Sequence, residues 1–462
     1  MATKSVFQRA LRRFGRDRRG NYAMMTAVLA PMLLVGVGYG LNVAQISTAR
    51  SNLLAALDSA VTSTARDISI GVIKPENAEP MIEAFLVANG RRAFSEGDRI
   101  KLDEVVVDRF RKTVMAKASV RVDMVFPLFG ASNKQVLRTE SAAMYSDRKI
   151  EVAMMLDVTG SMRKSGKTDK IGDLKNAATI AVEALLSGNK YSPDRIRVAL
   201  VPYAASVNAG ALAKATVFIE EKNGPNLPPT GWTPPSKRKD NCATERKMEN
   251  GTADLSDDAP DSERWNSQTK KYYKALVNRD ERLDNETTTK CPAAAVVPLT
   301  TDEARLKNEI ASFVADGNTG GSIATQWTYY MLSPNWRNAI TAAGLGAGPA
   351  DPDPDKLAKI AILMTDGEYN RAYAGSSSNM TTNAQNNAKN LCARMKADGI
   401  EVFTIGFALP ASQSAASRTT LKNCASPDTP LTKHFYDAAT GEELKKAFQD
   451  IVRNIERLAL IR

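Results

Sequence analysis

The stretch EVAMMLDVTGS, residues 151–161, is a hydrophobic run that ends in a carboxylate and two hydroxyls. Its first part has the length and composition of a buried strand. The side chains of Asp157, Thr159 and Ser161 follow at positions i, i+2 and i+4. A strand that leads into oxygen-bearing side chains is typical of open α/β folds, whose ligands bind at the carboxyl ends of parallel strands.

A second corner of the same kind occurs later in the chain. Residues 360–365, IAILMT, have the pattern of a buried strand and lead directly into Asp366 and Gly367. Carboxyl ends of parallel strands meet at one edge of a sheet, so we expect Asp157 and Asp366 to lie close together.

Strands and helices alternate through residues 149–462. This pattern predicts an α/β fold with a doubly wound, mostly parallel, Rossmann-like sheet. The elements expected here are strands at 195–202 and 401–407 and helices at 170–186, 302–314, 382–397 and 441–458.

The predicted sheet is interrupted at about residues 222–298, a segment rich in Lys, Asp, Glu, Asn and Pro that we interpret as an insertion.

Four cysteines allow three disulfide connectivities. We favour pairing of sequence neighbours, and four free buried thiols are the alternative. A zinc site is less favoured, because the chain has no C-x-x-C motif and a single histidine, His434, which we interpret as structural. The favoured pairs are Cys242 with Cys291 and Cys392 with Cys424.

The N-terminal region has the pattern of a membrane anchor. The formal net charge is +11, and seven of the basic residues lie within the first nineteen positions. No charged residue occurs from Asn21 to Ala49. We predict a basic cytoplasmic segment at 1–20 and a transmembrane helix at 21–45, with the rest of the chain outside the cytoplasm. A cleaved signal peptide is the alternative, although the apolar run exceeds the usual length of one.

Residues 46–148 are predicted to form a stalk helix and a small α+β region. Apolar residues at helical spacing indicate that the membrane helix continues to about Asp67. Residues 99–110 and 111–126 alternate as strands do, and place Val120, Val122, Met124 and Phe126 on one face. The small-residue helix either packs against a neighbouring helix or serves as a simple spacer.

Three alternatives to a cation site can be considered for the Asp157 loop. Residues 160–168, GSMRKSGKT, resemble a phosphate-binding P-loop, but five residues separate the glycines where that motif has four. A phosphotransferase with Asp157 as nucleophile would need a second acid at position 159, which is threonine. Asp157 could also serve only as a helix cap.

The spacing Asp157-x-Thr159-x-Ser161 is the D-x-S/T-x-S motif, and residues 149–462 resemble the von Willebrand factor A domain family. This resemblance implies a metal-ion-dependent adhesion site that binds Mg²⁺, with Mn²⁺ and Ca²⁺ as alternatives. It implies direct coordination by the hydroxyls of Thr159, Ser161 and Thr319, and contacts through water from Asp157 and Asp366. In that family an acidic group of a partner completes the coordination, so we expect a binding protein and no enzyme.

Two further motifs are similar to the TadG-like proteins of the TadE/TadG family, which assist assembly of bacterial tight-adherence (Flp) pili. They are the RRGN run at 18–21, followed by an apolar helix, and the run WTYYMLSP at 327–334. The resemblance implies a single-pass protein of the bacterial inner membrane, with its bulk in the periplasm or on the surface. Its partners would be pilus or other envelope proteins, with no nucleic acid and no small-molecule substrate. The rival functions are an extracytoplasmic nucleotide hydrolase with a P-loop-like site and a metal-independent structural stalk.

Overall fold

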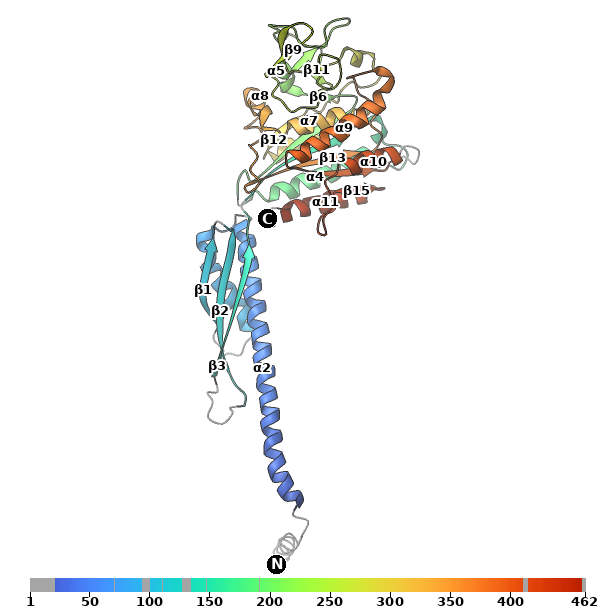
Figure 1. The fold of residues 1–462 in the computed structure, drawn as a ribbon. Helices are drawn as coiled ribbons and strands as arrows, with labels where there is room; N and C mark the ends of the chain where they lie inside the picture. Colours follow the sequence, from blue (N-terminus) through green and yellow to red (C-terminus); the bar gives the residue numbers. More distant parts are fainter. Residues whose placement is uncertain are drawn as a thin grey trace, which may run out of the picture. The chain divides into compact units, whose positions relative to one another are not determined.

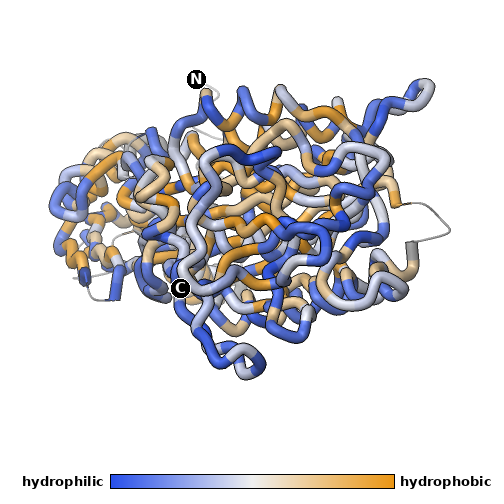
Figure 2. Tube along the Cα trace, turned by 90° about the horizontal axis from the view of Figure 1, so that it is seen from above, coloured by the Kyte–Doolittle hydropathy of each residue, from blue (hydrophilic) through white to orange (hydrophobic). Residues whose placement is uncertain are grey.

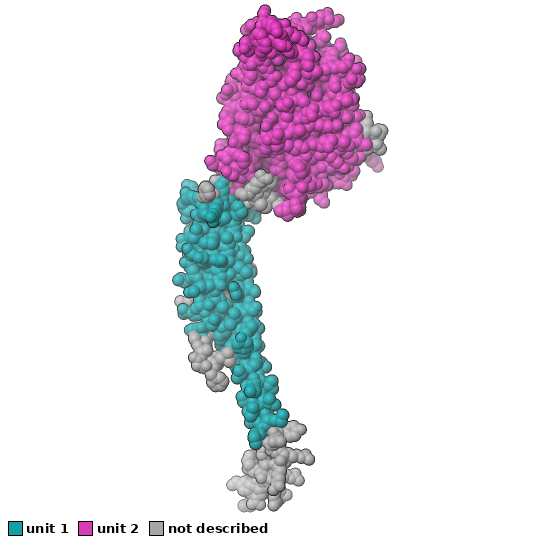
Figure 3. Space-filling model, in the orientation of Figure 1, with its two compact units in different colours: residues 1–145 teal, residues 146–462 magenta. Residues whose placement is uncertain are grey.

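The computed structural model describes residues 21–69, 71–93, 100–109, 111–126, 134–146, 148–190, 192–409 and 414–458. The chain divides into two compact units, unit 1 (residues 1–145) and unit 2 (residues 146–462), as Figure 3 shows. The basic segment predicted at 1–20 lies outside the described residues.

Unit 1 is built on the long helix α2 (Asn21–Ser69), which packs against the shorter helix α3 (Ala78–Ala93) and a three-stranded sheet (Figure 1). The first half of α2 is apolar and exposed, and only 6 % of its most apolar window is buried. This helix is long and apolar enough to cross a membrane, properties that membrane anchors and signal sequences share. In its second half Leu53, Leu57 and Val61 are fully buried, so this part of α2 is not a bare stalk.

The sheet of unit 1 is antiparallel, in the order β1 (Ile100–Asp108), β2 (Thr113–Asp123) and β3 (Lys134–Met144). Val120 and Val122 face the core, as the alternation predicts. Strand β2 ends at Asp123, however, so Met124 and Phe126 lie beyond it, and the side chain of Phe126 is exposed. The alternation therefore continues past the end of the hydrogen-bonded ladder.

In its described residues, unit 2 contains a main mixed sheet with helices on both faces and two small two-stranded sheets (Figure 1). Its strands are β4 (Lys149–Asp157), β5 (Ile196–Tyr203), β6 (Val207–Asn208), β7 (Val217–Ile219), β8 (Cys242–Ala243), β9 (Glu263–Asn266), β10 (Lys271–Lys274), β11 (Val277–Arg279), β12 (Val297–Thr300), β13 (Leu357–Thr365), β14 (Ile400–Phe407) and β15 (Phe435–Ala438). Its α-helices are α4 (Lys170–Ser187), α5 (Ala213–Thr216), α6 (Glu303–Ala311), α7 (Gly321–Tyr330), α8 (Arg337–Ala342), α9 (Met380–Ala397), α10 (Ser414–Cys424) and α11 (Gly441–Leu458).

The main sheet has the order β15-β14-β13-β4-β5-β6-β8, with β12 also paired to β5. The neighbours from β15 to β5 are parallel, whereas β6, β8 and β12 are attached in antiparallel fashion. The expected parallel sheet is thus present in part. Because β4 and β13 are adjacent and parallel, their carboxyl ends lie at the same edge.

Helices cover the sheet from both sides. Alternate residues of β4 enter two separate cores: Met154 packs with α4, α6 and α11, whereas Met155 packs with α7 and α9. Hydrophobic stretches run through the interior of the fold and hydrophilic ones follow the outer loops (Figure 2). The aromatic run that begins at Trp327 belongs to the core, since Trp327 and Trp336 are fully buried.

The insertion contributes small sheets and loops of its own. Strands β9 and β10 form a hairpin, β11 pairs with β7, and β8 extends the main sheet. Both favoured disulfides are present, and Cys242–Cys291 closes the insertion while Cys392–Cys424 links α9 to α10. All cysteines of the described residues therefore belong to these two disulfides, and none is free.

Candidate metal site

Three loops of unit 2 meet at the carboxyl edge of the sheet. Strand β4 ends at Asp157, and the neighbouring strand β13 ends immediately before Asp366. The third loop joins through the backbone, where the amide of Gly160 donates to the carbonyl of Gly317 at 2.9 Å. A side chain at position 160 would bring its Cβ to 3.2 Å from that same carbonyl oxygen, so glycine permits this close approach.

Four of the five predicted site residues are joined in a ring of hydrogen bonds. The amides of Thr159 and Asp366 donate to Oδ1 and Oδ2 of Asp157, at 2.9 and 3.3 Å. The hydroxyls of Thr159 and Ser161 are 3.0 Å apart, and Ser161 donates to Oδ1 of Asp366 at 2.5 Å. The side chains of Asp157, Thr159 and Asp366 are buried, whereas Ser161 is exposed. The ring is therefore open to solvent at Ser161.

Asp157 connects the ends of the neighbouring strands. Besides the two amides, its Oδ2 accepts hydrogen bonds from Tyr203 and from the hydroxyl of Thr365, both at 2.8 Å. Burial raises the pKa of Tyr203 well above its usual value, and the charge of Asp157 adds to this rise, so the phenol stays protonated and donates. Asp157 thereby fixes both strand ends at once, which is more than the cap of a single helix.

Thr319, the fifth predicted residue, lies in the third loop and is 5 % exposed. Its amide donates to Oδ1 of Asn370 at 3.0 Å, and its carbonyl accepts from the amides of Asn370 and Arg371. These backbone contacts join Thr319 to the loop after Asp366. The hydrogen-bond ring itself does not include Thr319.

Lys170 also belongs to the site, although the sequence patterns do not predict it. Its ammonium lies 2.9 Å from Oδ2 of Asp366, and its side chain is 17 % exposed. Lys170 is the first residue of α4, where a cation opposes the helix dipole. The position of Lys170 at the start of a predicted helix, where the dipole disfavours a cation, is the sequence signal that could have identified it.

Asp366 is a buried carboxylate whose charge its neighbours compensate only in part. Burial and, to a lesser extent, the nearby charge of Asp157 raise its pKa to about 6, while Ser161 and Lys170 act in the opposite direction. The ionised form thus lacks full compensation in the protein alone. A divalent cation at this place would supply the missing positive charge and favour the ionised form.

The donor set fits a hard cation. It consists of hydroxyl and carboxylate oxygens, which Mg²⁺ prefers. The hydroxyl oxygens of Thr159 and Ser161 are 3.0 Å apart, which is close to the edge of an octahedron, about 2.9 Å for magnesium–oxygen bonds of about 2.1 Å. Among the described residues, no group of three or more His, Cys, Asp or Glu side chains has the arrangement of a metal site.

The geometry argues against a phosphate cradle in the same loop. The backbone of Ser165 pairs with that of Thr168 in both directions, which turns the chain back on itself around Gly166. Helix α4 begins only afterwards, and the carboxylate of Asp169 caps it by accepting from the amide of Gly172. An acidic cap stands where a P-loop would hold a phosphate, and two negative charges there repel each other.

His434 has a structural role, as the sequence indicates. It is 2 % exposed, its Nε2 lies 2.8 Å from Oε1 of Glu401, and its ring stacks on Phe403. These contacts hold it at the start of the edge strand β15.

The insertion contacts two of the three site loops through Glu286. This carboxylate accepts from Nδ2 of Asn318, which precedes Thr319, at 2.6 Å. It also accepts from Nε of Arg371 and from the hydroxyl of Tyr373, at 2.9 and 2.8 Å. One residue of the insertion therefore connects the Thr319 loop with the loop after Asp366.

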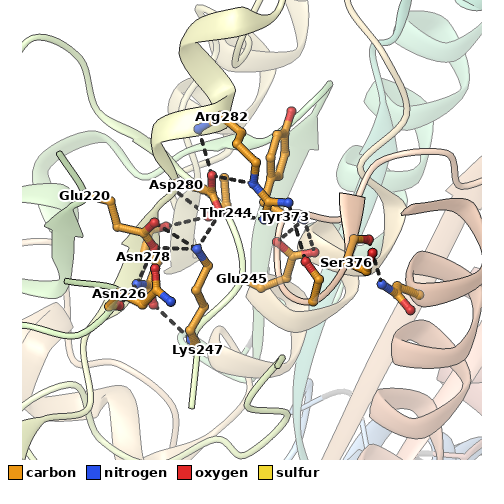
Figure 4. Close-up of polar contacts among 12 residues, drawn as sticks. Glu220, Asn226, Thr244, Glu245, Lys247, Asn278, Asp280, Arg282, Tyr373 and Ser376 are labelled. Atoms are coloured by element: carbon orange, nitrogen blue, oxygen red, sulfur yellow. Dashed lines mark hydrogen bonds and ion pairs between the residues drawn. The ribbon is translucent and has the colours of Figure 1, made fainter. Parts of the chain in front are cut away.

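A buried cluster of charges holds the insertion together (Figure 4). The ammonium of Lys247 lies 2.7 Å from Glu220 and 2.5 Å from Asp280, and Arg282 reaches Asp280 at 2.9 Å. Beside it, both carboxylate oxygens of Glu245 accept from the amide of Tyr373. We call these five charged residues the insertion cluster. It fastens the insertion to the loop that follows Asp366.

A family model for the von Willebrand factor type A domain matches residues 346–450. The matched stretch includes Asp366 and begins after the other four predicted site residues. No curated protein sequence matches the chain.

Three pilus proteins are among the solved structures that are similar to this chain. The pilus adhesin SpaC from Lactobacillus rhamnosus GG has a TM-score of 0.38 and 12 % identity, with 79 % of this chain and 35 % of that chain covered. A mutant of the PilB minor pilin from Streptococcus sanguinis gives 0.34 and 12 %, with coverages of 79 % and 80 %. The pilus adhesin RrgA from Streptococcus pneumoniae gives 0.32 and 13 %, with coverages of 78 % and 49 %. The chain thus spans 35 % of the length of SpaC.

Proposed function

We propose that the chain is a binding protein without enzymatic activity, because residues 346–450 match a von Willebrand factor type A domain. In this proposal a divalent cation, Mg²⁺ in the first place, recruits an acidic group of a partner protein. The partner belongs to the pilus or the cell envelope, and the role is assembly of a tight-adherence pilus or attachment to a surface. The two TadG-like motifs, at 18–21 and 327–334, support this choice of partner.

The observation that carries the proposal is the hydrogen-bond ring of Asp157, Thr159, Ser161 and Asp366. The ring gathers two hydroxyls and two carboxylates from separate loops at a site that is open to solvent at Ser161. A helix cap alone would not need the second strand end. We therefore assign the ring, with Thr319, to the binding of a cation.

Each residue has a distinct role in this proposal. Thr159, Ser161 and Thr319 supply hydroxyl oxygens, and Asp157 and Asp366 supply negative charge, as the family resemblance implies. When bound, Mg²⁺ offers an electron-poor coordination position to a carboxylate from outside. Exposure of Ser161 leaves room for that carboxylate, and the buried Asp157 keeps the loops in place as it arrives.

The proposed location is the bacterial inner membrane, with unit 2 outside the cytoplasm. Helix α2 is long and apolar enough to serve as the anchor, and the basic residues before it favour a cytoplasmic N-terminus. Two disulfides in unit 2 support an oxidising compartment for that unit.

Calorimetric titration of the full chain in detergent with MgCl₂ tests the proposal. Ser161→Ala removes a hydroxyl of the ring, so we expect the affinity for Mg²⁺ to fall by about 100-fold or more. Ser165→Ala is the matched control, because Ser165 lies in the same loop and is held there by its backbone. Absence of Mg²⁺ binding by the unchanged chain, or equal affinity of both variants, would refute the proposed site.

One observation favours a second candidate, a metal-independent structural stalk. Lys170 already places a positive charge 2.9 Å from Asp366, so the corner holds a cation of its own. In that case Ser161→Ala should leave pilus assembly and attachment unchanged in cells. A loss of either in the Ser161→Ala strain, with normal protein levels, argues for the metal-dependent role.

A further inference from the structure

The end of strand β2 is fastened to helix α2 by amide side chains of the helix. Asn42 donates from Nδ2 to the carbonyl of Phe126 at 2.7 Å and accepts from the amide of Phe126 at 3.2 Å. Gln45 donates to the carbonyl of Asp123 at 2.9 Å and accepts from the amide of Val125 at 3.2 Å. In Figure 1 the lower ends of β2 and β3 lie beside α2. We call residues 123–126 the strand-end segment.

The side-chain amide of each residue, Asn42 and Gln45, both donates to and accepts from backbone groups. These backbone groups lie at the end of the sheet or beyond it. In water these backbone groups could bind solvent, and no such side chains would be needed. In a low-dielectric region each unpaired backbone group costs several kcal/mol, so it must find a partner within the protein. Asn42 and Gln45 are spaced three residues apart, which places both on the helix face toward the sheet. These side-chain hydrogen bonds would satisfy the backbone of the strand-end segment in a region that excludes water.

The strand-end segment lies beside the apolar part of α2. The ring of Phe126 packs against Gly38, where an added Cβ would come within 2.7 Å of it. Counted along the helix, Gly38 is about 18 Å from Arg50, the first charged residue after the apolar run. A hydrocarbon layer of about 30 Å that begins at Met24 would extend about 9 Å beyond Gly38. Phe126 is therefore at a depth where lipid is expected.

The described residues at this level present an apolar surface. Val125 is 71 % exposed and Phe126 39 %, and on the helix beside them Val37 and Tyr39 are 60 % and 61 % exposed. The charged pair of Asp123 and Lys134, 4.0 Å apart, follows at the end of the β2–β3 ladder. An apolar surface that ends in charged groups matches the boundary between acyl chains and lipid headgroups.

We propose that the strand-end segment enters the outer leaflet of the membrane that α2 crosses, with Val125 and Phe126 in contact with acyl chains. This inference rests on the membrane anchoring proposed above. Unit 1 is then attached to the bilayer at two places, the helix and the strand-end segment. Asn42 and Gln45 are positioning residues that allow the backbone of the segment to leave water.

Depth measurement with a spin label tests this inference. All four native cysteines are bonded, so Val125→Cys introduces a single reactive thiol in the full chain. The labelled chain is reconstituted into phosphatidylcholine–phosphatidylglycerol vesicles, and collisions with oxygen and with a water-soluble nickel chelate are compared. We expect at least about tenfold fewer collisions with the chelate than at Met144→Cys, a 48 % exposed position in β3.

The outcomes separate this inference from the anchoring. If the vesicles float without the chain, the anchoring fails and this inference fails with it. If the chain floats but both labels meet the chelate equally, only the strand-end insertion is overturned. Exclusion of both reagents at position 125, with broadening from spin–spin contact, would indicate a second copy of the chain in place of lipid and would also overturn it.

A second variant tests the positioning role of Asn42. Asn42→Leu keeps the helix apolar but removes the partner of two backbone groups of Phe126. We expect the label at position 125 to move toward water, with chelate collisions about fivefold higher. Unchanged depth in the Asn42→Leu variant would contradict the role of Asn42.

Discussion

The Asp157 corner, which comprises the hydrogen-bond ring and Lys170, and the insertion cluster each contain a buried carboxylate whose pKa is raised. The two regions differ in their access to solvent. Burial raises the pKa of Asp366 to about 6 and that of Glu245 to about 7. Asp366 lies behind the exposed hydroxyl of Ser161, whereas Glu245 is enclosed and bonded to the backbone of Tyr373. The first site is therefore accessible from solvent, whereas the second is enclosed by protein.

This difference shows that buried negative charge can have two different roles in the same unit. In the insertion cluster Lys247 and Arg282 compensate Glu220 and Asp280, so the cluster is a closed structural network. In the Asp157 corner Lys170 is paired with Asp366, whereas Asp157 accepts hydrogen bonds from hydroxyls and backbone amides. We interpret the first as a fixed support and the second as a site prepared for a ligand.

Removal of Lys247 from the insertion cluster should have the largest effect. Lys247→Met leaves the buried Glu220 without its cationic partner and Asp280 with Arg282 alone, so we expect a loss of about 3–5 kcal/mol in unfolding free energy. Chemical denaturation of the full chain in detergent measures it. Lys237→Met, at an exposed lysine of the same insertion, is the control and should change little. A loss below about 1 kcal/mol would show that the network is not a support.

The raised pKa of Glu245 should make the stability of the protein depend on pH. Its pKa is raised from 4.5 to about 7 in the folded chain, so folding takes up a proton between these values. Stability from this group is greatest below about pH 4.5 and is lost as pH rises to about 7, by about 1–3 kcal/mol. Glu245→Gln should flatten this slope.

Thermal melts at several pH values measure the change. Glu249→Gln is the control, since Glu249 is partly exposed and its pKa is lowered by hydrogen bonds from Ser267, which gives a small effect of opposite sign. An identical slope in Glu245→Gln and the unchanged chain would assign the pH dependence to other groups.

Glu286 connects the insertion with the site loops, and its removal tests whether they cooperate. Glu286→Gln weakens the hydrogen bonds from Asn318 and Arg371, which join the loop of Thr319 to the loop after Asp366. We expect the affinity for Mg²⁺ to fall about fivefold to tenfold, with a smaller change in unfolding free energy. Titration calorimetry beside Glu263→Gln, at an exposed glutamate of the insertion, gives the comparison. Equal affinities would mean that the insertion does not set the geometry of the site.

Lys170 should have the smallest effect, and in the opposite direction. Its ammonium occupies a place beside Asp366 that a divalent cation would share. Lys170→Gln removes this competition, so we expect Mg²⁺ to bind about threefold to fivefold more tightly. Lys175→Gln, on the same helix with its ammonium on the carbonyl of Ala311, is the control. Weaker binding in Lys170→Gln would make Lys170 a support of the site instead of a competitor.

Much of the fold follows from local patterns in the sequence. The strands that end at Asp157 and before Asp366 are continuous apolar runs, and such runs identify buried parallel strands. Strand β3 is not predicted, because it exposes most of its residues and lacks apolar alternation. Strands β6 and β8 have two residues each, too few for any periodic signal. Their antiparallel attachment explains why the sheet is mixed.

The candidate site is predictable where its residues sit at strand ends and less so elsewhere. Asp157, Thr159, Ser161 and Asp366 follow apolar runs, so their meeting can be inferred from topology. Lys170, Tyr203 and Glu286 approach from a helix, a neighbouring strand and the insertion, and such contacts depend on tertiary packing. The choice of Thr319 depends on the family resemblance, and its role in metal binding stays a prediction.

Anomalous diffraction from a crystal of the protein soaked in MnCl₂ tests cation binding at the Asp157 corner most directly. We predict one strong anomalous peak in the Asp157 corner, about 2.0–2.3 Å from the hydroxyl oxygens of Thr159 and Ser161. The Ser161→Ala crystal, treated alike, should lose it. A map with no peak in this corner at saturating Mn²⁺, while Lys170 still contacts Asp366, would contradict the account.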